Sequence, residues 1–218
     1  MLRWFRQPTP RSRPTAPRRA VLSLEALEAR DCPAAPALTL SVTMLEQRVV
    51  LLTGQVTDES PASVTITFGG VMAGMTTPDA TGAYSYMAEA SGLGTVTAVA
   101  TDNEQLSSEV ASGLVSSNAP SFIEFGAAEG PNRYWTFTGR VSDESPAGLI
   151  VRFGGGMPSL EGKTAEVQAD GTFTLVVQLN EGEWGVVTAD LIDWWGLEAS
   201  QASYFVSPTP SGSEQQGG

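Results

Sequence analysis

The sequence predicts an all-β protein with two tandem β-sandwich domains behind a short basic leader. Three observations lead to this fold class: one sequence pattern occurs twice, apolar and polar residues alternate in short runs, and turn-forming residues separate those runs. A chain of 218 residues can hold one large domain or two of the roughly 100-residue size typical of β-sandwiches. The repeat favours two.

The leader comes first, in residues 1–37. Residues 1–19 mix arginine with proline, serine and threonine, which favours disorder. Residues 20–34 (AVLSLEALEARDCPA) have apolar residues at helical spacing and predict a short amphipathic helix that ends before Pro33. No apolar run approaches the length of a membrane span, so we expect no transmembrane segment.

The two copies follow, and we place them at residues 38–117 and 118–207. Residues 54–62 (GQVTDESPA) recur as 139–147 (GRVSDESPA), and residues 81–85 (TGAYS) match 170–174 (DGTFT). The spacing between matching segments grows only in small steps, as short loop insertions would produce. Residues 116–120 (SSNAP) join the copies, and this short, proline-terminated linker favours an extended, semi-rigid pair. The tail, 208–218, is expected to be disordered.

Each copy has the pattern of a series of short strands. Residues 63–68 (SVTITF) alternate in polarity, and residues 172–177 (TFTLVV) start directly after Asp170-Gly171, a hairpin signal. Residues 96–100 and 185–189 have the same β-branched character, and nothing after the leader has a sustained helical period. About seven strands per copy predict a sandwich of two antiparallel sheets.

Composition excludes several classes of function. The net charge is −12, yet seven of the twelve basic residues lie at or before Arg30, so the rest of the chain is strongly acidic and would repel nucleic acid. Histidine is absent, and the single cysteine, Cys32, lies in the leader. The body therefore lacks the usual general base, a cysteine nucleophile, the common zinc ligands and an intrachain disulfide. We predict that the protein is not an enzyme.

The leader carries one recognisable motif. Residues 24–30 (LEALEAR), between an arginine-rich tract and residues 32–34 (CPA), resemble the N-terminal LExLExR segment of large surface proteins of planctomycete bacteria. The resemblance implies export or surface sorting, and hence an extracellular or cell-surface location. The alternative interpretation is a plain amphipathic helix with a basic tail.

The repeated body looks like the immunoglobulin-like (Ig-like) and cadherin-like repeats of bacterial surface proteins. The resemblance covers residues 38–207 and depends on the GxVxDESPA and DGTFT patterns, which are mainly turn chemistry and specify fold more than function. It implies a secreted or surface-bound structural spacer or adhesin. A surface protein or a polysaccharide is the expected partner.

Acidic residues cluster in equivalent loops of the two copies: Asp58, Glu59, Asp102 and Glu104 in the first, and Asp143, Glu144 and Asp193 in the second. Carboxylates gathered at the ends of sandwiches suit calcium, which the resemblance to cadherin-like repeats also implies. The alternative is that the aspartates cap their own turns and the glutamates are solvated. The linker has Asn118 where cadherin linkers carry further acidic ligands.

An aromatic pair, Trp194-Trp195, stands in the second copy where the first has Asn103-Glu104. Adjacent side chains on a strand point to opposite faces, so at most one of the two belongs to the core. An exposed ring could stack on a sugar, which makes a carbohydrate-binding module the alternative function. Burial, or contact with the first copy, is the other interpretation of the pair.

Overall fold

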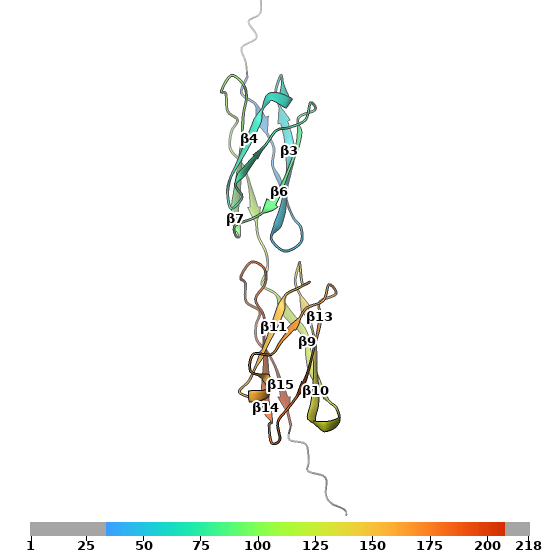
Figure 1. Ribbon diagram of the computed structural model, residues 1–218. Coiled ribbons are helices and arrows are strands. Elements are labelled where there is room, and N and C mark those ends of the chain that lie inside the picture. Colours follow the sequence, from blue (N-terminus) through green and yellow to red (C-terminus); the bar gives the residue numbers. More distant parts are fainter. Residues whose placement is uncertain (1–33, 208–218) are drawn as a thin grey trace, which may run out of the picture. The chain divides into compact units, whose positions relative to one another are not determined.

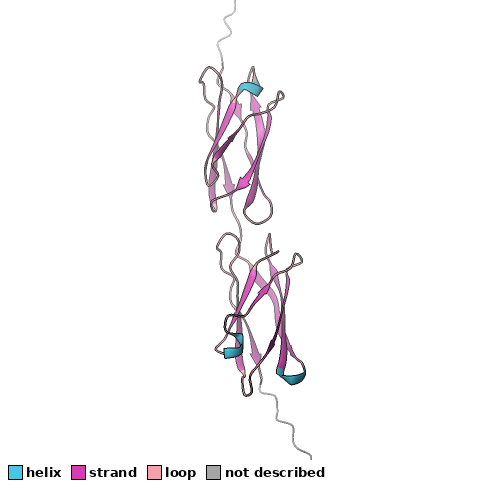
Figure 2. Cartoon of the chain, viewed as in Figure 1, coloured by secondary structure: helices cyan, strands magenta, loops and turns pink. Residues whose placement is uncertain are grey.

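The computed structural model describes residues 34–207. The expected leader helix, Cys32 and the expected disordered tail lie outside these residues. Within them, fifteen β-strands are joined by loops and by three single-turn 3-10 helices, at Pro61–Ser63, Pro131–Arg133 and Pro158–Leu160 (Figure 2). The all-β prediction is confirmed.

The first repeat contains two antiparallel sheets (Figure 1). In one sheet β3 pairs with β6 and, through successive segments, with β1 and β2. The other sheet has the order β5-β4-β7-β8. The strands are β1 (Ala37–Leu38), β2 (Ser41–Met44), β3 (Val49–Thr57), β4 (Thr65–Gly70), β5 (Gly74–Thr76), β6 (Ala83–Glu89), β7 (Gly94–Thr101) and β8 (Ala111–Val115).

The second repeat has the same plan. One sheet has the order β13-β10-β9, in which the long β10 takes the place of β3, and the other has the order β12-β11-β14-β15. The strands are β9 (Ser121–Glu129), β10 (Tyr134–Ser142), β11 (Ile150–Gly154), β12 (Thr164–Glu166), β13 (Thr172–Gln178), β14 (Gly185–Asp190) and β15 (Ala202–Val206). All pairings are antiparallel, as the hairpin signals predict.

Each repeat has its own hydrophobic core. Alternation in β4 buries Ile66 and Phe68 and leaves their neighbours exposed or half-buried, as expected for a strand with one face on a core. The first cluster gathers around Leu52, Ile66 and Val96, and the second around Phe137 and Phe173. Two cores of this kind make an Ig-like sandwich of each repeat. The boundaries 38–117 and 118–207 stay predictions.

The glycine that begins the GxVxDESPA pattern has a structural reason. In the second repeat Gly139 of β10 pairs with Phe173 of β13, and a Cβ at position 139 would collide with the Phe173 ring. In the first repeat Gly54 pairs with Tyr84, whose ring occupies the same space. The DGTFT and GAYS segments therefore supply the aromatic ring, and the GxVxDESPA segment supplies room for it.

Candidate functional site

The aspartate of each Asp-Glu-Ser-Pro loop caps its own turn. Oδ1 of Asp58 accepts a hydrogen bond of 2.8 Å from the backbone amide of Ser60, and Oδ1 of Asp143 accepts one of 2.8 Å from Ser145. An aspartate that bonds the amide two residues later stabilises a turn without any ligand. One oxygen of each carboxylate therefore already has a structural role.

The aspartates of the later hairpin are deeply buried and act in the same way. Asp102 accepts the amide of Leu106 at 2.8 Å, and Asp193 accepts the amides of Trp195 and Leu197 at 2.8 and 2.7 Å. Only 6% of Asp102 and 7% of Asp193 is exposed. Glu104 is exposed on the same hairpin as Asp102.

The second oxygens of three aspartates are left without a donor. Within residues 34–207, Oδ2 of Asp58, Asp143 and Asp193 is buried and has no hydrogen-bond partner. Burial raises the pKa of Asp143, as do the nearby charges of Glu144 and Asp193, while the amide of Ser145 lowers it. The structure therefore brings Asp143, Glu144 and Asp193 close enough to interact electrostatically. No group of three or more potential metal ligands is assembled in the described part of the chain.

The glutamates of the two loops face the segment that enters each repeat. Glu144 accepts the backbone amide of Asn118 at 3.1 Å, its side-chain amide at 3.0 Å and the Ser117 hydroxyl at 3.2 Å. Burial raises the pKa of Glu144, but the bonds from backbone amides and from the Asn118 and Ser117 side chains outweigh it, so the pKa is lowered overall. Glu59 accepts the amide of Ala34 at 3.4 Å.

Sequence reasoning missed this role of the glutamates. The signal that could have revealed it is the Ala-Pro pair that occurs where the chain enters each repeat, at 35–36 and 119–120. It shows that the entering segment belongs to the repeated unit. The bond itself is not visible in the sequence, because backbone amides carry no residue-specific signal.

Trp194 and Trp195 are both half-buried, in different surroundings. Nε1 of Trp194 donates a hydrogen bond of 2.9 Å to the carbonyl oxygen of Ser145, and the ring packs against the core of the second repeat. Trp195 packs against the core cluster of the first repeat, with the Arg48 guanidinium 6.0 Å from its ring centroid. These contacts favour burial and contact with the first copy over a free stacking surface.

The exposed tryptophan of the second repeat is Trp184, which lies outside the adjacent pair Trp194-Trp195. It is 57% exposed and meets Phe205, which is 55% exposed, with ring centroids 6.3 Å apart and planes at 70°. Rings at this angle do not form one flat platform. Trp184 precedes β14, whose outward-facing Val186 is opposite Phe205.

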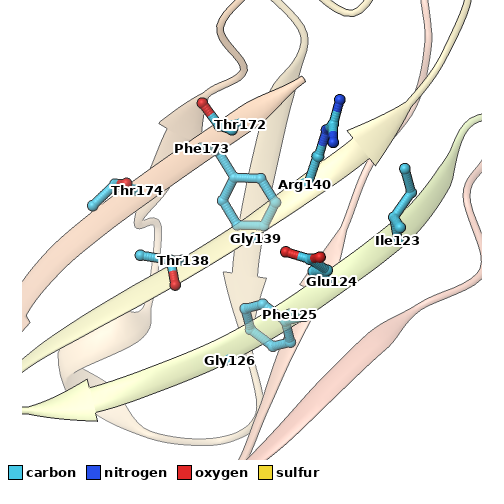
Figure 3. Close-up of a pocket in the computed structure, with 10 residues that line it drawn as sticks. All are labelled: Ile123, Glu124, Phe125, Gly126, Thr138, Gly139, Arg140, Thr172, Phe173 and Thr174. Carbon is cyan, nitrogen blue, oxygen red and sulfur yellow. The ribbon is translucent and has the colours of Figure 1, made fainter. Parts of the chain in front are cut away.

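A hollow of about 730 Å³ lies against the sheet β9-β10-β13 (Figure 3). Thr138, Glu124 and Arg140 are among the side chains that line it, and a Cβ at Gly126 would meet only open space. Threonine hydroxyls with one guanidinium and one carboxylate can hydrogen-bond a polar surface. They do not make an activated nucleophile.

Comparison with known proteins identifies no family: no family model and no curated protein matches the chain. Solved structures resemble it at low sequence identity. The BSP domain of a biofilm associated protein is 16% identical, with 80% of this chain and 30% of that chain covered and a TM-score of 0.30. The D0-D1 domain of intimin is 17% identical, with 78% and 97% covered and a TM-score of 0.26. The fibronectin(III)-like modules of Clostridium thermocellum CbhA are 16% identical, with 80% and 90% covered and a TM-score of 0.29.

The chain spans about a third of the biofilm associated protein to which it was matched. Its own strands and cores define the class: an all-β protein with Ig-like sandwich repeats. None of the described residues belongs to a helix that is long and apolar enough to cross a membrane.

Proposed function

We propose that this chain is a non-catalytic Ig-like repeat module of the cell surface or extracellular space, acting as a structural spacer or adhesin. One observation carries the proposal: acidic and aromatic loop residues that were candidates for binding a ligand are hydrogen-bonded to the chain's own backbone. Asp143 and Asp193 accept hydrogen bonds from backbone amides of their own turns, and Trp194 donates one to a backbone carbonyl of a neighbouring loop. Side chains used in this way support shape and stability more than catalysis.

The proposal is tested by fractionating the cells that produce the protein and by treating intact cells with a protease. We expect the full chain in the medium or at the surface, where added protease removes it. A wholly cytoplasmic, protease-protected distribution would overturn the surface assignment and the export role proposed for the LExLExR segment.

Carbohydrate binding is the second candidate function, and the exposure of Trp184 favours it. An exposed indole face can stack on a pyranose ring. Affinity electrophoresis of the full chain through gels that contain soluble polysaccharides tests the idea. Retardation that Trp184→Ala abolishes would support it, while equal mobility in all gels would leave the spacer or adhesin function. Trp194→Ala and Trp195→Ala, in the same gels, test whether the adjacent tryptophan pair contributes to sugar binding.

Calcium binding stays part of the proposal at the acidic loops, where it is one of the two interpretations that the sequence allows. The supporting observation is the buried, unpartnered Oδ2 of Asp58, Asp143 and Asp193. An oxygen in this position loses its hydration on folding and gains no donor in return, and a bound cation would supply the missing partner.

A further inference from the structure

One hydrogen bond occurs at the same place in both repeats. The amide of Ala34 donates to Oε1 of Glu59 at 3.4 Å, and the amide of Asn118 donates to Oε1 of Glu144 at 3.1 Å. Two residues after each amide the segment has a proline, Pro36 or Pro120, and both prolines are buried. The entering segment is therefore held at two points in each repeat, by the glutamate and by the proline.

The second repeat adds two donors to this arrangement. The Asn118 side chain donates to Oε1 of Glu144 at 3.0 Å, and the Ser117 hydroxyl donates to Oε2 at 3.2 Å. Both oxygens of the Glu144 carboxylate are thus used. In the first repeat the position of Asn118 is taken by Ala34, and the sequence has Pro33 in the place of Ser117. Neither residue has a side-chain donor, and proline lacks the amide as well.

We propose that the glutamate of each Asp-Glu-Ser-Pro loop is a binding site for the peptide segment that enters its own repeat. The site is selective for asparagine two residues before the buried proline. Among residues 34–207, Glu144 accepts three hydrogen bonds from this segment and Glu59 accepts one. The neighbouring aspartate has a different partner, because its Oδ1 caps the turn of the same loop.

The chemistry of the site explains the selectivity. A carboxylate is an acceptor only, and a single Oε1 can take both the backbone and the side-chain N–H of one asparagine. Bonds to a charged acceptor are stronger than bonds between neutral groups. Because Asn118 lies in the linker between the repeats, Glu144 removes rotational freedom from the chain where it enters the second sandwich. This consequence rests on the proposed spacer function, whereas the site itself rests on the contacts.

Amide hydrogen exchange of the full chain tests the proposal, with matched variants in the two repeats. In Glu144→Ala we expect the Asn118 amide to exchange about tenfold faster, as loss of one bond to a charged acceptor predicts. Glu144→Gln keeps the length and one acceptor oxygen and should have a smaller effect. Glu59→Ala is the control, because it makes the same change at the other site and should leave Asn118 unaffected. Unchanged exchange at Asn118 in folded Glu144→Ala would overturn the site.

A gain-of-function variant tests the selectivity. Ala34→Asn supplies the donor that the first repeat lacks, so the amide at position 34 should exchange about tenfold more slowly. The gain should vanish when Ala34→Asn is combined with Glu59→Ala. An equal gain in both backgrounds, or no gain in either, would show that the glutamate does not select asparagine. These outcomes do not depend on where the protein resides, so a failed surface assignment would not imitate them.

Discussion

At the scale of single residues, the loops combine satisfied and unsatisfied oxygens in one carboxylate. Asp143 accepts the Ser145 amide through Oδ1 and buries Oδ2 without a partner. The same division occurs at Asp58. A buried acceptor with no donor costs stability, and the cost grows when the group is charged. The carboxylate therefore caps the turn, but it loses the hydration that its second oxygen has in the unfolded chain.

Asp143→Asn should make the protein more stable at pH 7. Burial and the charges of Glu144 and Asp193 raise the pKa of Asp143 above its ordinary value of 3.8. Ionisation of this carboxyl therefore destabilises the folded state. The destabilisation is absent below the unfolded-state pKa and is complete once the pH has risen through the folded-state pKa. Asparagine removes the charge and keeps the oxygen for the Ser145 amide. The melting temperature, measured in a calcium chelator from pH 3 to pH 7 (about the range over which aspartates titrate), should rise only at the upper end.

Asp170→Asn is a control with the opposite sign. Hydrogen bonds from the Thr172 side chain and amide lower the pKa of Asp170. Its stabilising contribution is therefore present above the unfolded pKa and lost as the pH falls through the folded one. This variant should lose stability at pH 7 and match the parent at low pH. A loss of stability in Asp143→Asn at pH 7 without calcium would contradict the repulsion inferred for Asp143.

Calcium should raise the melting temperature of the parent protein if it binds the acidic loops. A ligand that binds only the folded state stabilises it by about 2.7 kcal/mol at a concentration one hundred times its dissociation constant. The titration is done at about 0.15 M salt, where screening weakens loose association with the acidic surface. Asp58→Asn, Asp102→Asn and Asp193→Asn should reduce the rise.

The control for calcium is Asp190→Asn. Asp190 is an exposed residue at the end of β14, and its Oδ1 accepts a hydrogen bond from the Gln201 side chain. It should keep the full response. No response in the parent, or the same response in every variant, would eliminate calcium and leave the aspartates as turn caps.

At the scale of elements, the two repeats share the positions at which a side chain of one strand packs on its neighbouring strand. The sequence predicts strands that overlap β4, β7, β13 and β14; the predicted ranges are 63–68, 96–100, 172–177 and 185–189. Local alternation and turn residues suffice for this result, because a half-buried strand has a period of two. The cross-strand packing of Phe173 on Gly139 needs the register of β10 and β13, which no local pattern contains.

Gly139→Ala should destabilise the second repeat by about 1–3 kcal/mol, the usual cost of overpacking. A Cβ at this position meets the Phe173 ring and the carbonyl oxygen of Glu124. Chemical unfolding of the second repeat, followed by tryptophan fluorescence, measures the loss. Gly126→Ala, in the same sheet, is the matched control because its Cβ would meet open space. Equal effects of the two substitutions would disprove the packing argument.

At the scale of the whole molecule, the structure has two clusters of buried side chains, and we expect each to unfold as a separate unit. Phe137 is fully buried in the cluster of the second repeat, and Leu52 and Ile66 are fully buried in that of the first. Trp195 is the described side chain of the second repeat that packs against the cluster of the first. The number of cooperative units is therefore open to a direct test.

Phe137→Ala should destabilise the second repeat by about 3–5 kcal/mol. Hydrogen exchange should show faster opening of β10 and β13, while the amides of β4 and β7 keep the protection they have in the parent. Ile66→Ala should have the reverse pattern. A uniform loss of protection over residues 34–207 in either variant would mean that the repeats unfold as one unit and would disprove their independent unfolding.

The sequence by itself determined the fold class, the two copies of one pattern and the location of their turns. These follow from local chemistry: alternation, β-branched residues and Asp-Gly or Ser-Pro turns act within a few residues. It also anticipated that aspartates could cap their loops. Each of these properties depends on groups that lie close together along the chain.

The tertiary structure decided which residues meet across long separations. It paired Glu144 with Ser117 and Asn118, and it put the Trp195 ring against the first repeat's core. The sequence could not determine these contacts, because a carboxylate accepts any amide within reach and an indole packs on any apolar surface. Only the path of the folded chain brings one partner within reach and keeps the others away.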